Sequence, residues 1–182
     1  GSVSVALINI DSRKSFVDRL ALYIRSNFFI PDGRKGWVPY AYRQALDVIR
    51  EHGIDLLVTT GPPHSTHLAG LRLKKETGIR WIADMRDPWT TVYYNDMLPR
   101  TARTKRIDRG YEDSVLNNAD AVTVVSPGMQ QEFSLRSENV HVVMNGFDFD
   151  DMKDEGNAVL PDGRFRLTYT GNFKPNQHVP QI

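Results

Sequence analysis

The segment from Ile54 to Met85 constrains the fold of this chain more than any other. Residues 54–60 form a short apolar run rich in branched side chains, as in a strand buried on both faces. A helix pattern follows, with Ser65 placed to cap it and Gly78 to end it. A second strand is predicted over residues 80–85. Such a βαβ unit builds parallel sheets with right-handed crossovers.

The same alternation continues on both sides of this unit. Apolar periodicity predicts helices at residues 14–29 and 39–53, and another marked by Ile107, Tyr111, Val115 and Ala119. Strands are predicted at residues 121–126 and 140–145, with a capped helix start at Ser126-Pro127 between them. The sequence therefore predicts an α/β fold, a doubly wound, Rossmann-like parallel sheet over residues 3–150.

The composition changes after this domain. Residues 147–163 are rich in Asp, Glu, Asn, Lys and Gly, which indicates a linker centred on residues 151–163. A new strand at residues 165–170 then indicates the start of a second domain, residues 164–182. Gly1-Ser2 resembles a cloning scar, and the chain stops soon after the new strand begins. We expect a piece of a longer protein whose first domain lacks its natural first strands.

The overall composition narrows the class of protein. The chain has 182 residues, 40% hydrophobic and 25% charged, which is ordinary for a globular domain. It contains no cysteine, so a disulfide framework and a thiolate metal site are excluded, and no tight His/Asp cluster suggests a metal. Its apolar runs are far shorter than the ~20 residues of a membrane helix. A net charge of +1 gives no sign of a nucleic-acid partner, and we expect a cytoplasmic protein.

Unusual polar residues follow the predicted strands, where the ligands of open parallel sheets bind. Asp84, Arg86 and Asp87 bring three charges to one strand end, and we assign them a catalytic role; the alternative is an Arg86–Asp87 ion pair that shapes the loop. Gly61-Pro62-Pro63 after the first strand forms either a tight turn or a close approach to a ligand. His64 and His67 are either structural or contacts for a sugar hydroxyl or phosphate, and Trp89 either stacks on a sugar or plugs the core. The candidate ligand-binding residues are Gly61, Pro62, His64, Ser65, His67 and Trp89.

The segments GPPHS (residues 61–65) and DMRDPWT (residues 84–90) closely resemble the N-terminal domain of bacterial glycosyltransferase family 4, the group 1 glycosyl transferases. The likeness covers residues 37–173. It implies the N-terminal half of a GT-B fold, in which the N-terminal domain binds the acceptor and the C-terminal domain binds a nucleotide sugar. The resemblance thus makes the six candidate ligand-binding residues candidate acceptor contacts. It also implies sugar transfer with retention of configuration and without a metal or other cofactor. The resemblance places Gly171, Asn172 and Lys174 near the donor phosphates.

The sequence departs from the family pattern in three places. The glycine-rich loop after the first N-terminal strand has no counterpart here, and the chain ends before the paired-Glu motif of the donor domain. Arg86 stands where some relatives carry a histidine. We therefore expect this chain alone to be inactive.

A basic stretch at residues 99–110 contains five cations and only one acid, Asp108. The five are Arg100, Arg103, Lys105, Arg106 and Arg109. Such a patch is suited to an anionic membrane surface, here the inner face of the plasma membrane, or to a lipid diphosphate; a solvated helix face is an equal alternative.

These observations favour a glycosyltransferase that acts on an envelope glycan or a lipid-linked acceptor. Two alternatives remain open from the sequence. One is a non-catalytic Rossmann-like module that binds a nucleotide or sugar. The other is a GT-B enzyme that epimerises a sugar nucleotide.

Overall fold

A computed structural model describes residues 15–150, 163 and 165. The chain divides into two units after Asn145, and nearly all of the described residues belong to the first unit. The linker and the second predicted domain lie outside the described residues, apart from Gly163 and Phe165.

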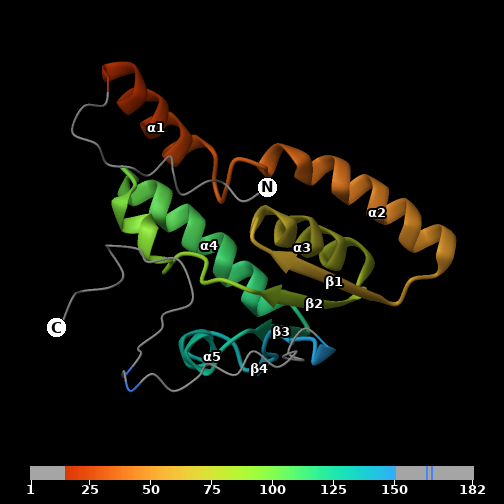
Figure 1. The fold of residues 1–182 in the computed structure, drawn as a ribbon. Coiled ribbons are helices and arrows are strands. Elements are labelled where there is room, and N and C mark those ends of the chain that lie inside the picture. Colours follow the sequence, from red (N-terminus) through yellow and green to blue (C-terminus); the bar gives the residue numbers. More distant parts are fainter. Residues whose placement is uncertain (1–14, 151–162, 164, 166–182) are drawn as a thin grey trace. The chain divides into compact units, whose positions relative to one another are not determined.

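The first unit is an α/β domain, as the sequence predicts (Figure 1). Its four strands form one parallel sheet in the order β1-β2-β3-β4. The strands are β1 (Leu56–Gly61), β2 (Arg80–Met85), β3 (Ala121–Val124) and β4 (Val140–Val142). The helices are α1 (Phe16–Phe28), α2 (Val38–His52), α3 (Ser65–Thr77), α4 (Ala102–Asn118) and α5 (Pro127–Ser134), with short 3₁₀ helices η2 (Lys35–Trp37) and η3 (Tyr93–Met97).

The predicted helix ends at glycine are confirmed. Gly53 follows α2 with φ 63° and Gly78 follows α3 with φ 69°, in the left-handed region that favours glycine. Ser126 caps α5 by accepting a hydrogen bond from Met129 N, with Pro127 in the first turn. Strands β3 and β4 end two and three residues earlier than the sequence predicts.

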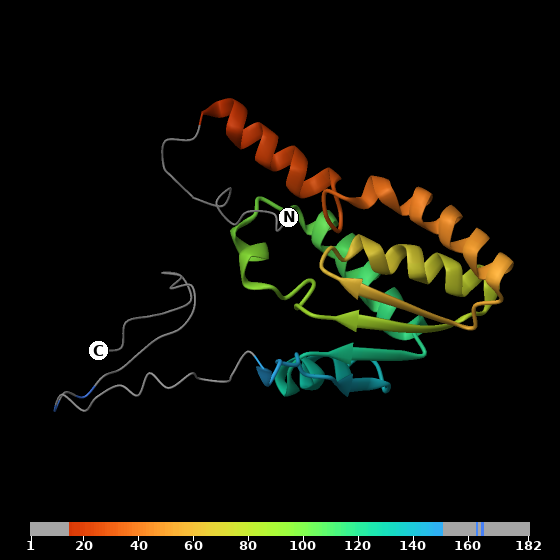
Figure 2. The ribbon, with the colours of Figure 1, turned by 45° about the vertical axis from the view of Figure 1, so that its right-hand side comes forward.

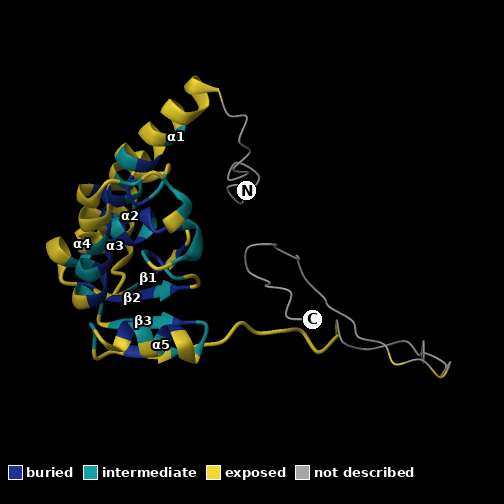
Figure 3. Cartoon of the chain, turned by 90° about the vertical axis from the view of Figure 1, so that its left-hand side faces the viewer, coloured by how far each residue is buried: buried dark blue, intermediate teal, exposed yellow. Residues whose placement is uncertain are grey.

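Helices α3, α4 and α5 all cover one face of the sheet. Each right-handed crossover moves one strand further in the same direction, which places each helix on the same side. Trp81 and Phe133, fully buried in the core cluster, belong to this covered face. Figures 2 and 3 show α3 and α4 together beside β1 and β2. The sequence predicts helices on both faces; among the described residues they lie on one.

This arrangement corrects the prediction that the first strand is buried on both faces. Strand β1 lies at the edge of the sheet that the structure describes, and Leu56 and Val58 point to its uncovered face with 47% and 57% of their surface exposed. Only the alternate positions, such as Thr59, are buried.

Helix α1 is amphipathic as predicted, but its apolar stripe is exposed (Figure 3). Phe16 is 72% exposed and Phe28 is 63% exposed. Asn27 holds the C-terminal end of this helix. Its Nδ2 donates a hydrogen bond to Pro99 O, and its Oδ1 accepts hydrogen bonds from Thr101 N and Thr104 Oγ1. No helix in the described part of the chain is long and apolar enough to cross a membrane.

Candidate functional site at the carboxyl edge of the sheet

The carboxyl ends of the four strands form one edge, and the two polar loops leave it side by side. Gly61 pairs with Met85 in the parallel register of β1 and β2. Arg86 N then donates a hydrogen bond to Gly61 O over 3.0 Å. The expectation that GPPHS and DMRDPWT emerge next to each other is therefore confirmed.

Arg86 and Asp87 are the exposed charges of this edge. Arg86 Nη2 donates to Asn145 Oδ1, which follows β4, over 3.3 Å. Within the described residues Arg86 and Asp87 form no ion pair, so the alternative of a loop-shaping pair between them is wrong. A guanidinium with a single long hydrogen bond at the rim has donors left for an anion.

Asp84 occupies a different position. It lies on the uncovered face, where Oδ2 accepts from Thr60 Oγ1 over 2.8 Å and Oδ1 accepts from Thr123 Oγ1 over 2.7 Å. The carboxylate thereby joins β1, β2 and β3. These contacts are those of a cross-strand tie, and the catalytic role assigned to Asp84 stays a prediction.

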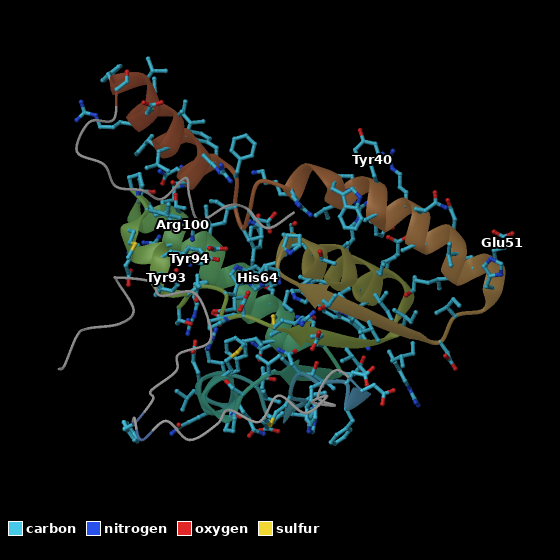
Figure 4. All side chains as sticks on the ribbon, in the orientation of Figure 1. Tyr40, Glu51, His64, Tyr93, Tyr94 and Arg100 are labelled. Atoms are coloured by element: carbon cyan, nitrogen blue, oxygen red, sulfur yellow. The ribbon has the colours of Figure 1, made fainter. Side chains whose placement is uncertain are left out.

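The GPPHS turn folds its histidines inward. Both X-Pro bonds of Gly61-Pro62-Pro63 are cis. His64 stacks on Trp89 with 4.8 Å between ring centroids, and His67 lies fully buried beneath them. His67 Nδ1 is 2.8 Å from Thr59 Oγ1, which also accepts from Trp81 Nε1. Figure 4 shows His64 in the interior of the domain, beside α3.

The two histidines explain why residue 61 is glycine. A Cβ on Gly61 would lie 2.6 Å from His67 Nε2 and 3.3 Å from His64 Nδ1. From the sequence, this glycine serves either a tight turn or a close approach of the backbone to a ligand; in the structure the groups closest to it are the protein's own imidazoles. Neither of these two nitrogens has a hydrogen-bond partner among the described residues.

Burial keeps both imidazoles neutral. It lowers the pKa of His67 to about 3, with the neighbouring His64 adding to the effect. Burial also lowers the pKa of His64, against the opposing charges of Asp32, Glu112 and Asp87. A neutral, fully buried His67 is not suited to bind phosphate or to exchange protons with a substrate.

Five of the six candidate acceptor contacts are buried. Ser65 and His67 are 0% exposed, Trp89 is 2% exposed, His64 is 9% exposed, and Gly61 is buried as well. Pro62 is the exposed member of the six. The signal that misleads here is sequence position, because a residue just past a strand end can still point into the core.

Asp32, from the loop before α2, caps α3. Its Oδ2 accepts from Ser65 N over 2.8 Å and its Oδ1 accepts from Ser65 Oγ over 2.9 Å. The prediction that Ser65 caps this helix is wrong, since Ser65 is the first helical residue and is itself bonded by the cap. Thr66 N and His67 N are also bonded, to Pro63 O and His64 O. A carboxylate already occupies this helix N-terminus, which excludes a phosphate there.

Two buried carboxylates on α4 form the main structural network that the sequence does not predict. Asp108 Oδ1 accepts from Trp89 Nε1 over 2.9 Å, and Oδ2 pairs with the buried Arg100 at 2.7 Å. Burial raises the pKa of Asp108, against the hydrogen bonds from Trp89 and Arg100. Glu112 lies one turn later. It accepts hydrogen bonds from the backbone N and the hydroxyl of Thr90 and pairs with Arg136 at 2.8 Å. Their spacing of four residues is the signal that places both on one helix face.

The basic stretch is largely neutralised by these and neighbouring acids. Arg100 pairs with Asp108, Lys105 with Asp96, and Arg109 with Glu112 and Asp113. Arg100 lies with Tyr93 and Tyr94 near the start of α4 (Figure 4). Of the five basic residues in this stretch, only Arg103 and Arg106 lack an ion pair with another described residue. Counting charges along the stretch therefore overestimates its free positive charge.

The parallel sheet with polar loops at its carboxyl edge agrees with a comparison against known families. Residues 5–151 match Glycosyltransferase Family 4. The chain belongs to this family. No curated protein matches the sequence closely enough to add a relative. Among the candidate catalytic residues of this glycosyltransferase family 4 domain, Arg86 and Asp87 keep an accessible charged group at the edge of the sheet.

The predicted donor contacts are not among the described residues. Gly171, Asn172 and Lys174 fall outside the described residues, so their assignment to the donor phosphates stays a prediction. Within residues 15–150, 163 and 165, no three His, Asp or Glu side chains gather as a metal site would require.

Proposed function

We propose that this glycosyltransferase domain is the acceptor-side half of a retaining enzyme that uses a nucleotide sugar as donor. The single observation that carries the proposal is the exposed Arg86 guanidinium at the carboxyl edge, in a chain of this family. Its backbone is fixed to Gly61 at 3.0 Å and its side chain reaches Asn145 at 3.3 Å.

The chemistry needs such a group. Departure of a nucleoside diphosphate leaves negative charge that preorganised cations and N–H donors stabilise. Arg86 offers a planar, always charged donor set that matches phosphate oxygens. For Asp87, exposed beside it, we propose contact with an acceptor hydroxyl. The reaction proposed is metal-independent.

The acceptor we propose is an envelope glycan or a lipid-linked sugar, with the enzyme in the cytoplasm. Contact with the inner face of a membrane stays a prediction from the sequence. Since three of the five basic residues at 99–110 are paired with acids, Arg103 and Arg106 are the residues to test for such contact.

The test is an assay of the full-length enzyme against a panel of UDP-, GDP- and dTDP-sugars. We expect one donor to be consumed, and Arg86→Ala to lower kcat about 10²- to 10³-fold, as loss of a preorganised donor does. Arg80→Ala is the matched control, because Arg80 is an exposed arginine at the opposite end of the same strand. Consumption of no donor, or an Arg86→Ala enzyme as fast as the parent, would overturn the proposal.

A further inference from the structure

A groove lies between the loop before α2 and the turn that follows β1. It has a volume of about 510 Å³ and is lined by Gly33, Arg34, Gly36, Trp37, Pro63 and Thr66. We call it the Trp37 groove. Small-molecule sites usually measure about 300–1,000 Å³, so this groove is large enough for a sugar ring.

The two walls of the Trp37 groove are fixed to each other. Asp32 binds Ser65 through two hydrogen bonds and also accepts from Arg34 N over 2.8 Å. One carboxylate therefore joins the loop that carries Trp37 to the turn that carries Pro63. A groove whose walls are held this way is formed before a ligand arrives, which lowers the entropic cost of binding.

The exposed side chain of Trp37 indicates the chemical class of ligand. It is 53% exposed, whereas Trp81 and Trp89 are 0% and 2% exposed. An indole presents a flat apolar face with a negative quadrupole, which suits the C–H-rich face of a pyranose. Pro63 adds a second apolar ring surface, and Thr66 and Arg34 bring polar atoms to the same lining.

The glycines leave the groove open. A Cβ added at Gly33 or Gly36 would have no other atom within 4 Å, so neither position is constrained by packing. Side chains at these two positions would narrow the groove that Trp37 lines. Their absence leaves room for a ring to approach the indole.

We propose that the Trp37 groove is a carbohydrate subsite, in which a pyranose ring of a glycan acceptor stacks on Trp37. The inference rests on the proposed function and narrows its acceptor to a glycan rather than a lipid chain. Pro63, two residues after the end of β1, lines the groove, so the groove and the carboxyl edge share the Gly-Pro-Pro turn.

The first test uses the 182-residue chain and tryptophan fluorescence. Trp37 is the exposed tryptophan of the three, so quenching by the neutral reagent acrylamide reports on it. We expect maltotriose, cellotriose or chitotriose at millimolar concentration to lower the quenching constant about twofold. Protection by none of the three sugars, or equal protection by inorganic phosphate, would overturn the subsite; the phosphate result would assign the groove to an anion held by Arg34.

The second test uses saturation-transfer NMR with the same three sugars. Trp37→Ala should weaken binding about tenfold, equivalent to about 1.4 kcal/mol. Gly36→Leu, which adds a side chain in the groove, should weaken it as well. Tyr40→Ala is the control, since Tyr40 is a 70% exposed aromatic on α2 that does not line the groove (Figure 4). Unchanged binding by Trp37→Ala would refute the proposal.

The two proposals fail separately. If the full-length enzyme transfers sugar and Trp37→Ala leaves the KM for its acceptor unchanged, the subsite is wrong and the transferase stands. If no nucleotide sugar is consumed but the chain binds oligosaccharide through Trp37, the transferase is wrong and the groove is a sugar site of another kind of protein.

Discussion

Acidification should destabilise the domain through His67. The pKa of this imidazole falls from its ordinary value of 6.5 to about 3 because the ring is buried and lies near His64. Since the folded-state pKa is lowered, the unfolded chain binds the proton first. Stability is therefore complete above pH 6.5 and decreases as the pH falls from there toward 3.

The size of the effect follows from the two pKa values. One pKa unit corresponds to about 1.4 kcal/mol, so moving from pH 7.5 to pH 5 removes about 2 kcal/mol of unfolding free energy through His67 alone. His67 is 0% exposed, so solvent does not screen this contribution to the unfolding free energy. The pKa of His64 is lowered as well, so this ring adds to the loss in the same direction.

Urea unfolding at the two pH values measures this loss, and His67→Asn isolates it. An asparagine amide keeps a polar group near the position of Nδ1 and a partner for Thr59, but it does not titrate. The variant should be less stable than the parent at pH 7.5, yet lose about 2 kcal/mol less on acidification. His52→Asn, at an exposed histidine that ends α2, should lose as much as the parent. Equal losses in the parent and His67→Asn would refute the reasoning.

Three further predictions concern packing, capping and a buried ion pair. Gly70→Ala would place a Cβ 2.7 Å from the Trp81 ring and 2.8 Å from Thr59 Cγ2. It should therefore lower the free energy of unfolding in urea by about 1–3 kcal/mol. Gly110→Ala, in open space on α4, should raise it by roughly 0.5–1 kcal/mol. Asp32→Ala removes the cap of α3 and should cost about 1 kcal/mol by the same assay; Asp32→Asn, which keeps an accepting oxygen, should cost less, and the reverse order would contradict the capping role. Arg100→Met leaves the buried Asp108 unpaired and should lower the free energy of unfolding by about 3–5 kcal/mol, whereas Lys105→Met, which removes an exposed pair with Asp96, should change it by less than about 1 kcal/mol.

Local patterns were sufficient to predict the elements and their order. The periodicity of four that predicts α1, the glycines that end α2 and α3, and the serine that caps α5 all act within a few residues. The order of the strands agrees with right-handed crossovers between consecutive strands, which leave few choices. The parallel sheet and the adjacency of the two loops were therefore predictable.

What covers each element depends on distant partners and was not predictable in the same way. Ile107 and Tyr111 fit the apolar period of α4, yet they are 38% and 37% exposed. The buried face of that helix carries Asp108 and Glu112 instead. A buried carboxylate is stable only with its partner, here Arg100 for Asp108 and Arg136 for Glu112, and the pairing exists only in the fold.

The Trp37 groove was missed for a related reason. Its two walls are about thirty residues apart in the chain, and the carboxylate that joins them, Asp32, reads in sequence as part of a helix-ending Pro-Asp-Gly turn. Nothing local marks Trp37 as exposed. The loop meets the turn through the hydrogen bonds that Ser65 donates to Asp32, which join residues far apart in the chain.

The residues that make GPPHS and DMRDPWT recognisable are mostly not the ones that a substrate would touch. Ser65, His67 and Trp89 are buried, and Gly61 is required by the histidines packed against it. Together they hold the turn in place and thereby hold Arg86 beside it. The recognisable motif thus describes a scaffold, and the proposed chemistry depends on the few exposed groups that this scaffold presents. Substitutions in the buried set should therefore act through stability, whereas substitutions of Arg86 should act on turnover with the fold intact.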